Sequence, residues 1–231
     1  MKIGVIGAGQ IGGSLTRRLS QLGHEVFVAN SRGPSALAGL SKETGAKAVT
    51  VQDAARASRV VIVTIPEAKI RNLPINLFEG VPGDVVVIDT GNYYPRERDG
   101  RIDEIEAGMQ ESRWVETRLG RPVVKAFNTM NYKHLLELGR PAGTPGRLAL
   151  PVAGDDPRAK QVVLWLIEQL GFDGVDDGGL DDSWRQQPGT PVYDKELDSA
   201  GVRHALAKAR NERTSQWRAA GNSSGSFAQR A

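Results

Sequence analysis

Three glycines near the N-terminus have the spacing of a phosphate-binding loop. Residues 7–12 read Gly-Ala-Gly-Gln-Ile-Gly and separate an apolar run at 2–6 from an amphipathic stretch at 11–22. Gly7 permits a tight turn, Gly9 lets a pyrophosphate approach the backbone, and Gly12 lets the helix pack closely on the strand. Because the helix N-terminus offers unpaired N–H groups, we expect dinucleotide contacts from Gly7, Ala8, Gly9, Gln10, Ile11 and Gly12. The alternative is a purely structural turn.

The end of the second apolar run indicates which dinucleotide is bound. NAD-specific sites usually place an acid about 20 residues after the glycine loop, where it binds the ribose 2′-hydroxyl. This chain instead has Asn30, Ser31 and Arg32. Arg32 could make charge-assisted bonds to a 2′-phosphate or stack on the adenine. We therefore predict NADP(H) rather than NAD(H), the alternative for Arg32 being a solvated loop charge.

The pattern around these residues predicts the fold class. Short apolar runs at 2–6, 25–29, 60–65, 85–89, 123–127, 147–152 and 172–175 alternate with helical stretches such as 11–22 and 157–170. Fully apolar strands separated by helices indicate a parallel sheet that is covered on both faces. We predict an α/β fold with a Rossmann-like, doubly wound, mainly parallel sheet and helices on both faces. Asp155 and Asp156, before Pro157, are expected to cap the helix at 157–170.

Composition and charge exclude several classes of protein. The chain has 231 residues, no Cys and a net charge of +3. Its longest apolar runs are far shorter than the roughly 18–20 residues of a membrane span. The N-terminus does not read as a signal peptide, so a cytoplasmic location without membrane attachment is expected. Residues 203–231 hold six basic residues and one acidic residue, whereas residues 1–202 hold 24 and 26. The nucleotide-binding part thus needs no basic face, and no nucleic-acid partner is expected.

The charge boundary also suggests how the chain is divided. We assign residues 1–202 to one NADP-binding domain that includes the acceptor-side segment. Residues 203–231 form a basic C-terminal segment, in which 205–220 are predicted to be helical and 221–231 a polar, frayed tail.

Further segments carry a family resemblance. With the glycine loop and Asn30-Ser31-Arg32, they are Val63-Thr64-Ile65-Pro66, Lys125-Ala126-Phe127-Asn128-Thr129 and Val152-Ala153-Gly154-Asp155-Asp156. Together these segments resemble the NADP oxidoreductases that use a deazaflavin coenzyme (coenzyme F420). They are also similar to the cytosolic nucleotide-binding domain of the six-transmembrane metalloreductases. The matching segments are spread over most of residues 1–190.

The resemblance implies roles for the residues that follow each strand. Thr64, Ile65 and Pro66 would line the cofactor between the pyrophosphate and the nicotinamide ribose. Ala126 and Asn128 would lie near the nicotinamide, where Asn128 could hold the carboxamide or the acceptor. Thr90 and Gly91 are added to the predicted cofactor contacts. For these segments the alternative is a strand end with buried turn residues.

The acceptor side is less well defined by the resemblance. Residues 89–95 and 183–191 differ from the form typical of deazaflavin enzymes. Asn92, Asn128 and Trp184 are the candidate catalytic residues. Trp184 with Arg185 could close the pocket over an acceptor ring or could simply pack, and an aromatic shelf at Tyr93 and Tyr94 is equally ambiguous.

No acid–base constellation is evident. None of the four tyrosines has Lys four positions later, which argues against the short-chain dehydrogenase pattern. His24, His134 and His204 are scattered, so no metal site is expected. Transfer of a hydride to a flavin-like ring depends mainly on positioning.

We therefore expect an NADPH-dependent oxidoreductase that uses a flavin, a deazaflavin or a small organic molecule as acceptor. The alternative is a non-catalytic NADP(H)-binding redox sensor or regulatory module. The resemblance makes a homodimer a candidate assembly, with the C-terminal helix as its contact.

Overall fold

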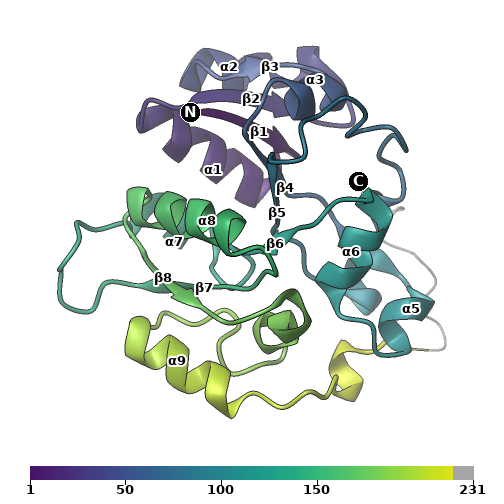
Figure 1. Cartoon of the computed structure of the whole chain (residues 1–231), viewed down its shortest axis with the longest axis vertical. Coiled ribbons are helices and arrows are strands. Elements are labelled where there is room, and N and C mark those ends of the chain that lie inside the picture. The colour runs from purple at the N-terminus through teal and green to yellow at the C-terminus, as the bar shows by residue number, and fades with distance from the viewer. Residues whose placement is uncertain (221–231) are drawn as a thin grey trace.

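A six-stranded parallel sheet forms the centre of the protein (Figure 1). The computed structural model describes residues 1–220. The strand order is β3-β2-β1-β4-β5-β6, and every pairing is parallel. The strands are β1 (Lys2–Ile6), β2 (Glu25–Ala29), β3 (Lys47–Ala48), β4 (Val60–Val63), β5 (Val86–Asp89) and β6 (Val124–Lys125). This arrangement confirms the predicted Rossmann-like fold.

Side chains alternate along the strands between two apolar cores, one on each face of the sheet. On β4, Val60 and Ile62 belong to one core, whereas Val61 and Val63 belong to the other. Because both faces are buried, the strands read as continuous apolar runs rather than as alternating ones.

Helices cover both faces. Leu15 and Leu19 of α1 (Gln10–Gln21), Leu135 of α7 (Tyr132–Glu137) and Leu166 of α8 (Pro157–Gln169) fill the first core. The second core contains residues of α3 (Val51–Arg56), α4 (Glu67–Ile70), α5 (Asp103–Glu106) and α6 (Glu111–Leu119). Figure 1 shows α1, α7 and α8 on one side of the central strands and α5 and α6 on the other. Helix α2 (Ala38–Thr44) packs beside α1.

The last two strands do not extend the central sheet, although the sequence predicts one continuous series. β7 (Ala149–Val152) and β8 (Asp173–Asp176) form a separate two-stranded parallel sheet. It meets the main sheet through an antiparallel bridge between Lys125 and Ala153. Helix α9 (Ser199–Lys208) covers this small sheet with Val202 and Leu206. As predicted, the Asp156 side chain caps α8 by accepting a bond from the N–H of Arg158. Asp155, also predicted to cap this helix, instead accepts a bond from the N–H of Leu180 at 2.8 Å.

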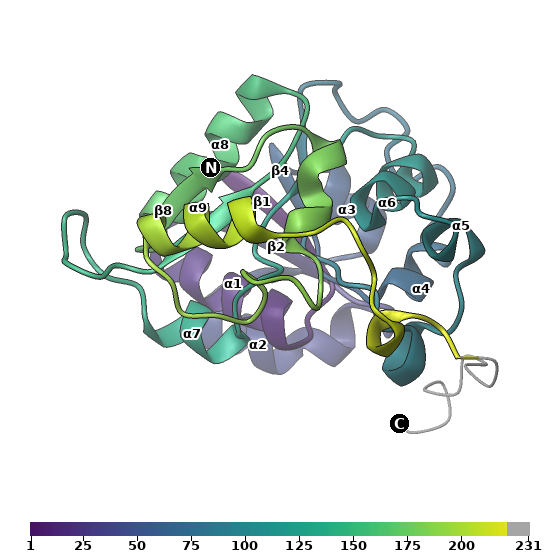
Figure 2. The same cartoon turned by 90° about the horizontal axis from the view of Figure 1, so that it is seen from below.

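The predicted helix at 205–220 is wrong over most of its length. Asp198 caps α9 at its start, and the helix ends at Lys208. The chain then runs extended through Ala209, makes one short turn at η4 (Ser215–Trp217), and crosses towards α5 (Figure 2). Ion pairs of this segment with the body of the protein replace the helical conformation that its composition favours. The predicted tail at 221–231 lies outside the described residues.

Within residues 1–220, the helices lack the combination of length and apolar character that a bilayer crossing requires.

Candidate functional site

The glycine loop joins β1 to α1 at the carboxyl edge of the sheet. Gly7 has a φ of +108°, and a Cβ there would strike the carbonyl oxygen of Thr64. A Cβ at Gly12 would strike the carbonyl oxygen of Gly7, which shows how closely the helix approaches the loop. Gly9 differs, because a Cβ there would meet nothing within 4 Å. The protein thus needs Gly7 and Gly12 for its own packing, and it leaves the space beside Gly9 open.

The first turn of α1 is suited to an anion. Gly9 is the N-cap residue and provides no capping side chain, and the first turn has no acidic residue. The N–H groups that open a helix have no partner within it and carry the positive end of its dipole. Because β1 and β4 are neighbours at the point where the strand order reverses, the loop lies at the usual binding crevice of such sheets.

A cavity of about 700 Å³ lies on one side of the loop. It contains Asn30, Ser31 and Arg32, and we call it the Arg32 pocket. The Asn30 side chain accepts a hydrogen bond from the Arg32 N–H at 3.0 Å, which fixes the turn after β2. The Arg32 side chain is exposed. Arg32 and Lys69 contribute two cations, and none of the described residues lining the pocket is acidic. These groups fit a 2′-phosphate.

A second cavity of about 430 Å³, the Asn128 pocket, lies next to the first. The two share Gly9, Thr64, Ile65 and Pro66. The predicted residues Gln10, Ile11, Thr90, Gly91, Asn92 and Asn128 also line it, together with Tyr94, Arg98, Phe127, Thr129, Met130, Asn131, Tyr132, Tyr193 and Asp194. The structure thus brings the ends of β4, β5 and β6 together around one space, as the resemblance implies.

Asn92 and Asn128 bind each other in the wall of this pocket. Asn92 Nδ2 donates to the carbonyl oxygen of Asn128, and Asn128 Nδ2 donates to Asn92 Oδ1, both at 3.0 Å. Asn128 Nδ2 also donates to the carbonyl oxygen of Gln186 at 2.8 Å. The Oδ1 atom of Asn128 is buried and has no partner among the described residues. The pair therefore fixes one wall of the pocket and retains one unused acceptor.

Backbone strain is concentrated at the same pocket. Phe127 and Asp194 have φ values of 65° and 53°, and they are the non-glycine residues with positive φ in the described chain. Both line the Asn128 pocket. Such conformations persist only where the surrounding structure enforces them, and they cluster at ligand sites.

Buried charges lie behind the loop after β5. Lys125 Nζ donates to Asp89 Oδ2 at 3.0 Å and to the carbonyl oxygen of Gly91 at 2.7 Å. Burial lowers the pKa of Lys125, but the adjacent carboxylates, Asp89 foremost, outweigh this and raise it overall. Glu67 is fully buried, and its carboxyl oxygens have no partner among the described residues. Burial, reinforced by Asp89, raises the pKa of Glu67 well above its usual range.

Three predicted site residues line neither the Arg32 pocket nor the Asn128 pocket. Trp184 was expected beside the acceptor, but it lines a separate cavity with Asp177 and Arg203, and its ring stacks against Arg185. Trp184 lies in η3 (Leu180–Gln186), which places it against α9 and the small sheet. Ala126 is fully buried and Gly12 packs behind the loop, so neither lines the Arg32 pocket or the Asn128 pocket.

The tyrosines of the predicted shelf separate. Tyr93 is fully buried, and its hydroxyl binds Glu106 and the N–H of Ile102. Tyr94 lines the Asn128 pocket. His134 lies in α7, where its Nδ1 atom is 3.4 Å from Glu196 Oε1.

Sequence reasoning missed several lining residues. Lys69 belongs to a short helix after Pro66, and a lysine on a surface helix carries no distinctive pattern. Tyr193 and Asp194 follow the small sheet, more than 60 residues from the strand ends that they face. The one signal in the sequence was the positive charge of Lys69, which would suit a phosphate.

The fold and the two adjacent pockets define the class: a dinucleotide-binding protein of the Rossmann type. The family model "NADP oxidoreductase coenzyme F420-dependent" matches residues 2–93. The chain is 32% identical to the hypothetical protein SMa0349 of Sinorhizobium meliloti, with 84% of this chain and 92% of that one covered and a TM-score of 0.70. An Arthrobacter sp. FB24 protein, proposed to be an F420-dependent NADP reductase, is 27% identical over 80% of this chain and 87% of its own, with a TM-score of 0.66.

The Escherichia coli (strain K12) protein YjhV is 46% identical over 70 residues, which are 30% of this chain and 51% of that protein. The chain thus matches about half the length of this curated relative. On these findings the chain belongs to the family of NADP oxidoreductases described as coenzyme F420-dependent.

Proposed function

We propose that the protein transfers a hydride between NADP(H) and a flavin, a deazaflavin or a small organic acceptor. The observation that carries the proposal is the open Asn128 pocket, which adjoins the Arg32 pocket and shares Gly9 and Thr64 with it. A dinucleotide lying along the glycine loop would span both pockets. Its phosphates would lie at the start of α1, and its reactive ring would face Asn92 and Asn128.

NADPH, when bound, supplies the hydride, and the residues of this chain position it. Gly9 admits the pyrophosphate, and the first turn of α1 offers it free N–H groups. Arg32 and Lys69 would hold the 2′-phosphate. Thr64 and Pro66 form the wall between the two pockets. Such positioning is the main contribution that a protein makes to hydride transfer between two ring systems.

The non-catalytic sensor requires the same cofactor site, but it does not require space beside the nicotinamide. A cavity of about 430 Å³ lined by Asn92 and Asn128 therefore supports the enzyme. Because Trp184 lies elsewhere, the acceptor wall in the proposed site consists of Asn92, Asn128, Tyr94 and Tyr193.

The test is NADPH consumption, followed at 340 nm, with FMN, coenzyme F420 or a small ketone as acceptor. We expect turnover with at least one of them, and much slower consumption of NADH. Gly9→Ala, which fills the space for the pyrophosphate, is the matched negative control. Tight NADPH binding without turnover on any acceptor would overturn the enzyme proposal in favour of the sensor.

A further inference from the structure

The segment that follows α9 lies against the loop that lines the Asn128 pocket. We call residues 209–219 the C-terminal strap. Figure 2 shows this segment leaving α9 and crossing to the neighbourhood of α5. The N–H of Ala219 donates to Glu106 Oε1 at 2.8 Å, which fixes the far end of the strap beside α5.

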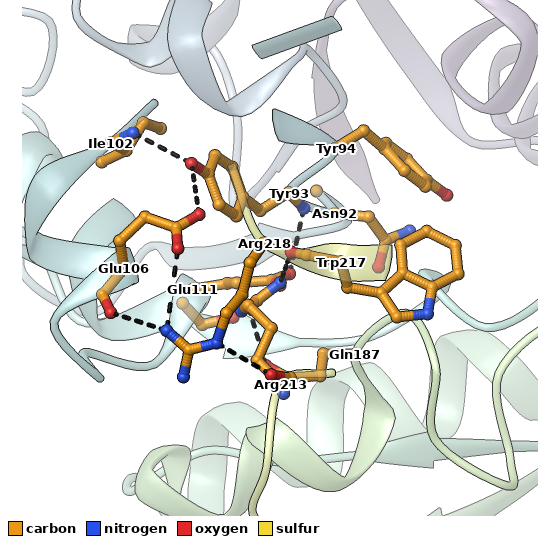
Figure 3. A network of polar contacts seen from close by, with 12 residues as sticks. Asn92, Tyr93, Tyr94, Ile102, Glu106, Glu111, Gln187, Arg213, Trp217 and Arg218 are labelled. Carbon is orange, nitrogen blue, oxygen red and sulfur yellow. Dashed lines mark hydrogen bonds and ion pairs between the residues drawn. The ribbon is translucent and has the colours of Figure 1, made fainter. Parts of the chain in front are cut away.

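A buried ion pair fixes the middle of the strap. Arg213 Nη2 donates to Glu111 Oε1 at 2.5 Å, and the two side chains are only 8% and 3% exposed. Glu111 Oε2 accepts the N–H of Tyr93 at 3.1 Å, so one carboxylate binds both the strap and the loop after β5 (Figure 3). Arg213 also stacks over the Tyr93 ring and donates to Gln187 Oε1. A charged pair this deeply buried is costly to break.

A second set of bonds comes from the loop itself. Arg96 donates to the carbonyl oxygens of Ser215 at 2.7 Å and of Arg218 at 2.9 Å. Arg218 in turn donates to the carbonyl oxygen of Arg213 at 2.9 Å. The strap is therefore bound to the loop that carries Asn92, Tyr94 and Arg98. The contacts are the bonds donated by Arg96 and the packing of Arg213 on Tyr93.

These anchors place Trp217 against two residues of the pocket wall. Its ring centroid lies 6.0 Å from that of Tyr94 and 6.3 Å from that of Tyr193, both in tilted or edge-on geometry. The hydroxyl groups of Tyr94 and Tyr193 are hydrogen-bonded to each other. Gly189 has a φ of +90°, and a Cβ there would strike the indole, so the backbone also closes around this ring.

We propose that Trp217 is a positioning residue for the acceptor: it holds the Tyr94–Tyr193 pair as one rigid wall of the Asn128 pocket. The C-terminal strap would thus be part of the site, not an appendage. This inference rests on the proposed function for its effect on turnover, but its structural part can be tested without turnover. Burial raises the pKa of both phenols, so they remain protonated hydrogen-bond donors at neutral pH.

The experiment compares Trp217→Ala, Trp217→Phe and Trp165→Ala. Trp165 is a half-exposed tryptophan on α8 that packs on His24, so it controls for the loss of an indole elsewhere. The first readout is nitration of individual tyrosines by tetranitromethane, mapped by peptide mass spectrometry and compared with nitration of the same tyrosines in Trp165→Ala. We expect Trp217→Ala to speed nitration of Tyr94 and Tyr193 relative to Trp165→Ala by about threefold to tenfold, as for loss of an aromatic pair.

The second readout is steady-state kinetics with whichever acceptor supports turnover. Trp217→Ala should lower kcat/KM for the acceptor by about tenfold. It should leave the NADPH dissociation constant unchanged, and Trp217→Phe should recover most of the activity. Equal nitration and equal acceptor kinetics in Trp217→Ala and Trp165→Ala would overturn the inference. If the unmodified protein reduces no acceptor, the proposed function fails, whereas unchanged nitration alone refutes the role of Trp217.

Discussion

The hydroxyl of Thr64 donates a hydrogen bond to the carbonyl oxygen of Gly7 at 3.0 Å. Thr64 follows β4 and Gly7 follows β1, so this bond joins the two strand ends at the point where the strand order reverses. Thr64 also lines both pockets. The bond therefore sets the distance between the glycine loop and the wall that the two pockets share.

Replacing Thr64 with Val removes this bond but keeps the shape of the side chain. A single hydrogen bond contributes about 1 kcal/mol, so NADPH affinity should fall by about fivefold. Titration calorimetry would measure the change. Thr117→Val, which removes a comparable hydroxyl-to-carbonyl bond on α6, is the control and should bind NADPH normally. Unchanged affinity in Thr64→Val would show that the loop does not need this bond.

Gly9→Ala should separate binding from folding. The new methyl group meets no protein atom within 4 Å, so thermal stability should be nearly unchanged. It would occupy the space proposed for the pyrophosphate, and NADPH affinity should fall by at least about tenfold. Gly39→Ala on α2 has equally open surroundings and serves as the control. Normal NADPH binding by Gly9→Ala would mean that the phosphates lie elsewhere.

Arg32→Ala should change cofactor preference rather than binding in general. Losing a charge-assisted contact costs about 1.5–3 kcal/mol, so NADPH should bind about 10- to 100-fold more weakly. NADH, which has no 2′-phosphate, should be little affected. Arg59→Ala is a suitable control, because Arg59 is an exposed arginine just before β4, at the amino ends of the strands and away from both pockets. Equal weakening of NADPH and NADH would refute a 2′-phosphate contact.

Glu67→Gln should remove a pH dependence of stability. Because the folded pKa of Glu67 is raised, its folded carboxyl keeps a proton that the unfolded chain loses as the pH rises above about 4.5. Stability should therefore fall by about 1.4 kcal/mol per pH unit between the unfolded and the folded pKa. Urea unfolding of Glu67→Gln at pH 4.5 and pH 8 should show a smaller loss than in the unmodified protein.

Exposed Glu137 on α7 provides the control for this change. Glu137→Gln should retain the pH dependence of the unmodified protein. If Glu67→Gln retains it as well, Glu67 does not hold the proton, and the buried carboxyl must be ionised beside Lys125.

Local sequence was sufficient for the fold class and for the residues that line the two pockets at the strand ends. The glycine loop, the turn at Asn30–Arg32 and Thr64-Ile65-Pro66 each follow a strand directly. Because parallel strands end at the same edge, their sequence positions already imply that they meet. Lys69 was missed there because a single lysine on a short helix forms no pattern.

The acceptor side was decided by tertiary structure. Trp184 was predicted to lie beside the acceptor, but it faces a different cavity. Tyr193 lines the Asn128 pocket because the chain after β8 returns to the strand ends. The composition of residues 205–220 favours a helix, but the pairing of Arg213 with Glu111 and the bonds from Arg96 hold an extended strap instead. Helix propensity is worth only tenths of a kcal/mol per residue, so a few buried contacts with distant residues can override it. Sequence therefore determined which residues meet at the strand ends, and only long-range packing decided which residues line the Asn128 pocket from the other side.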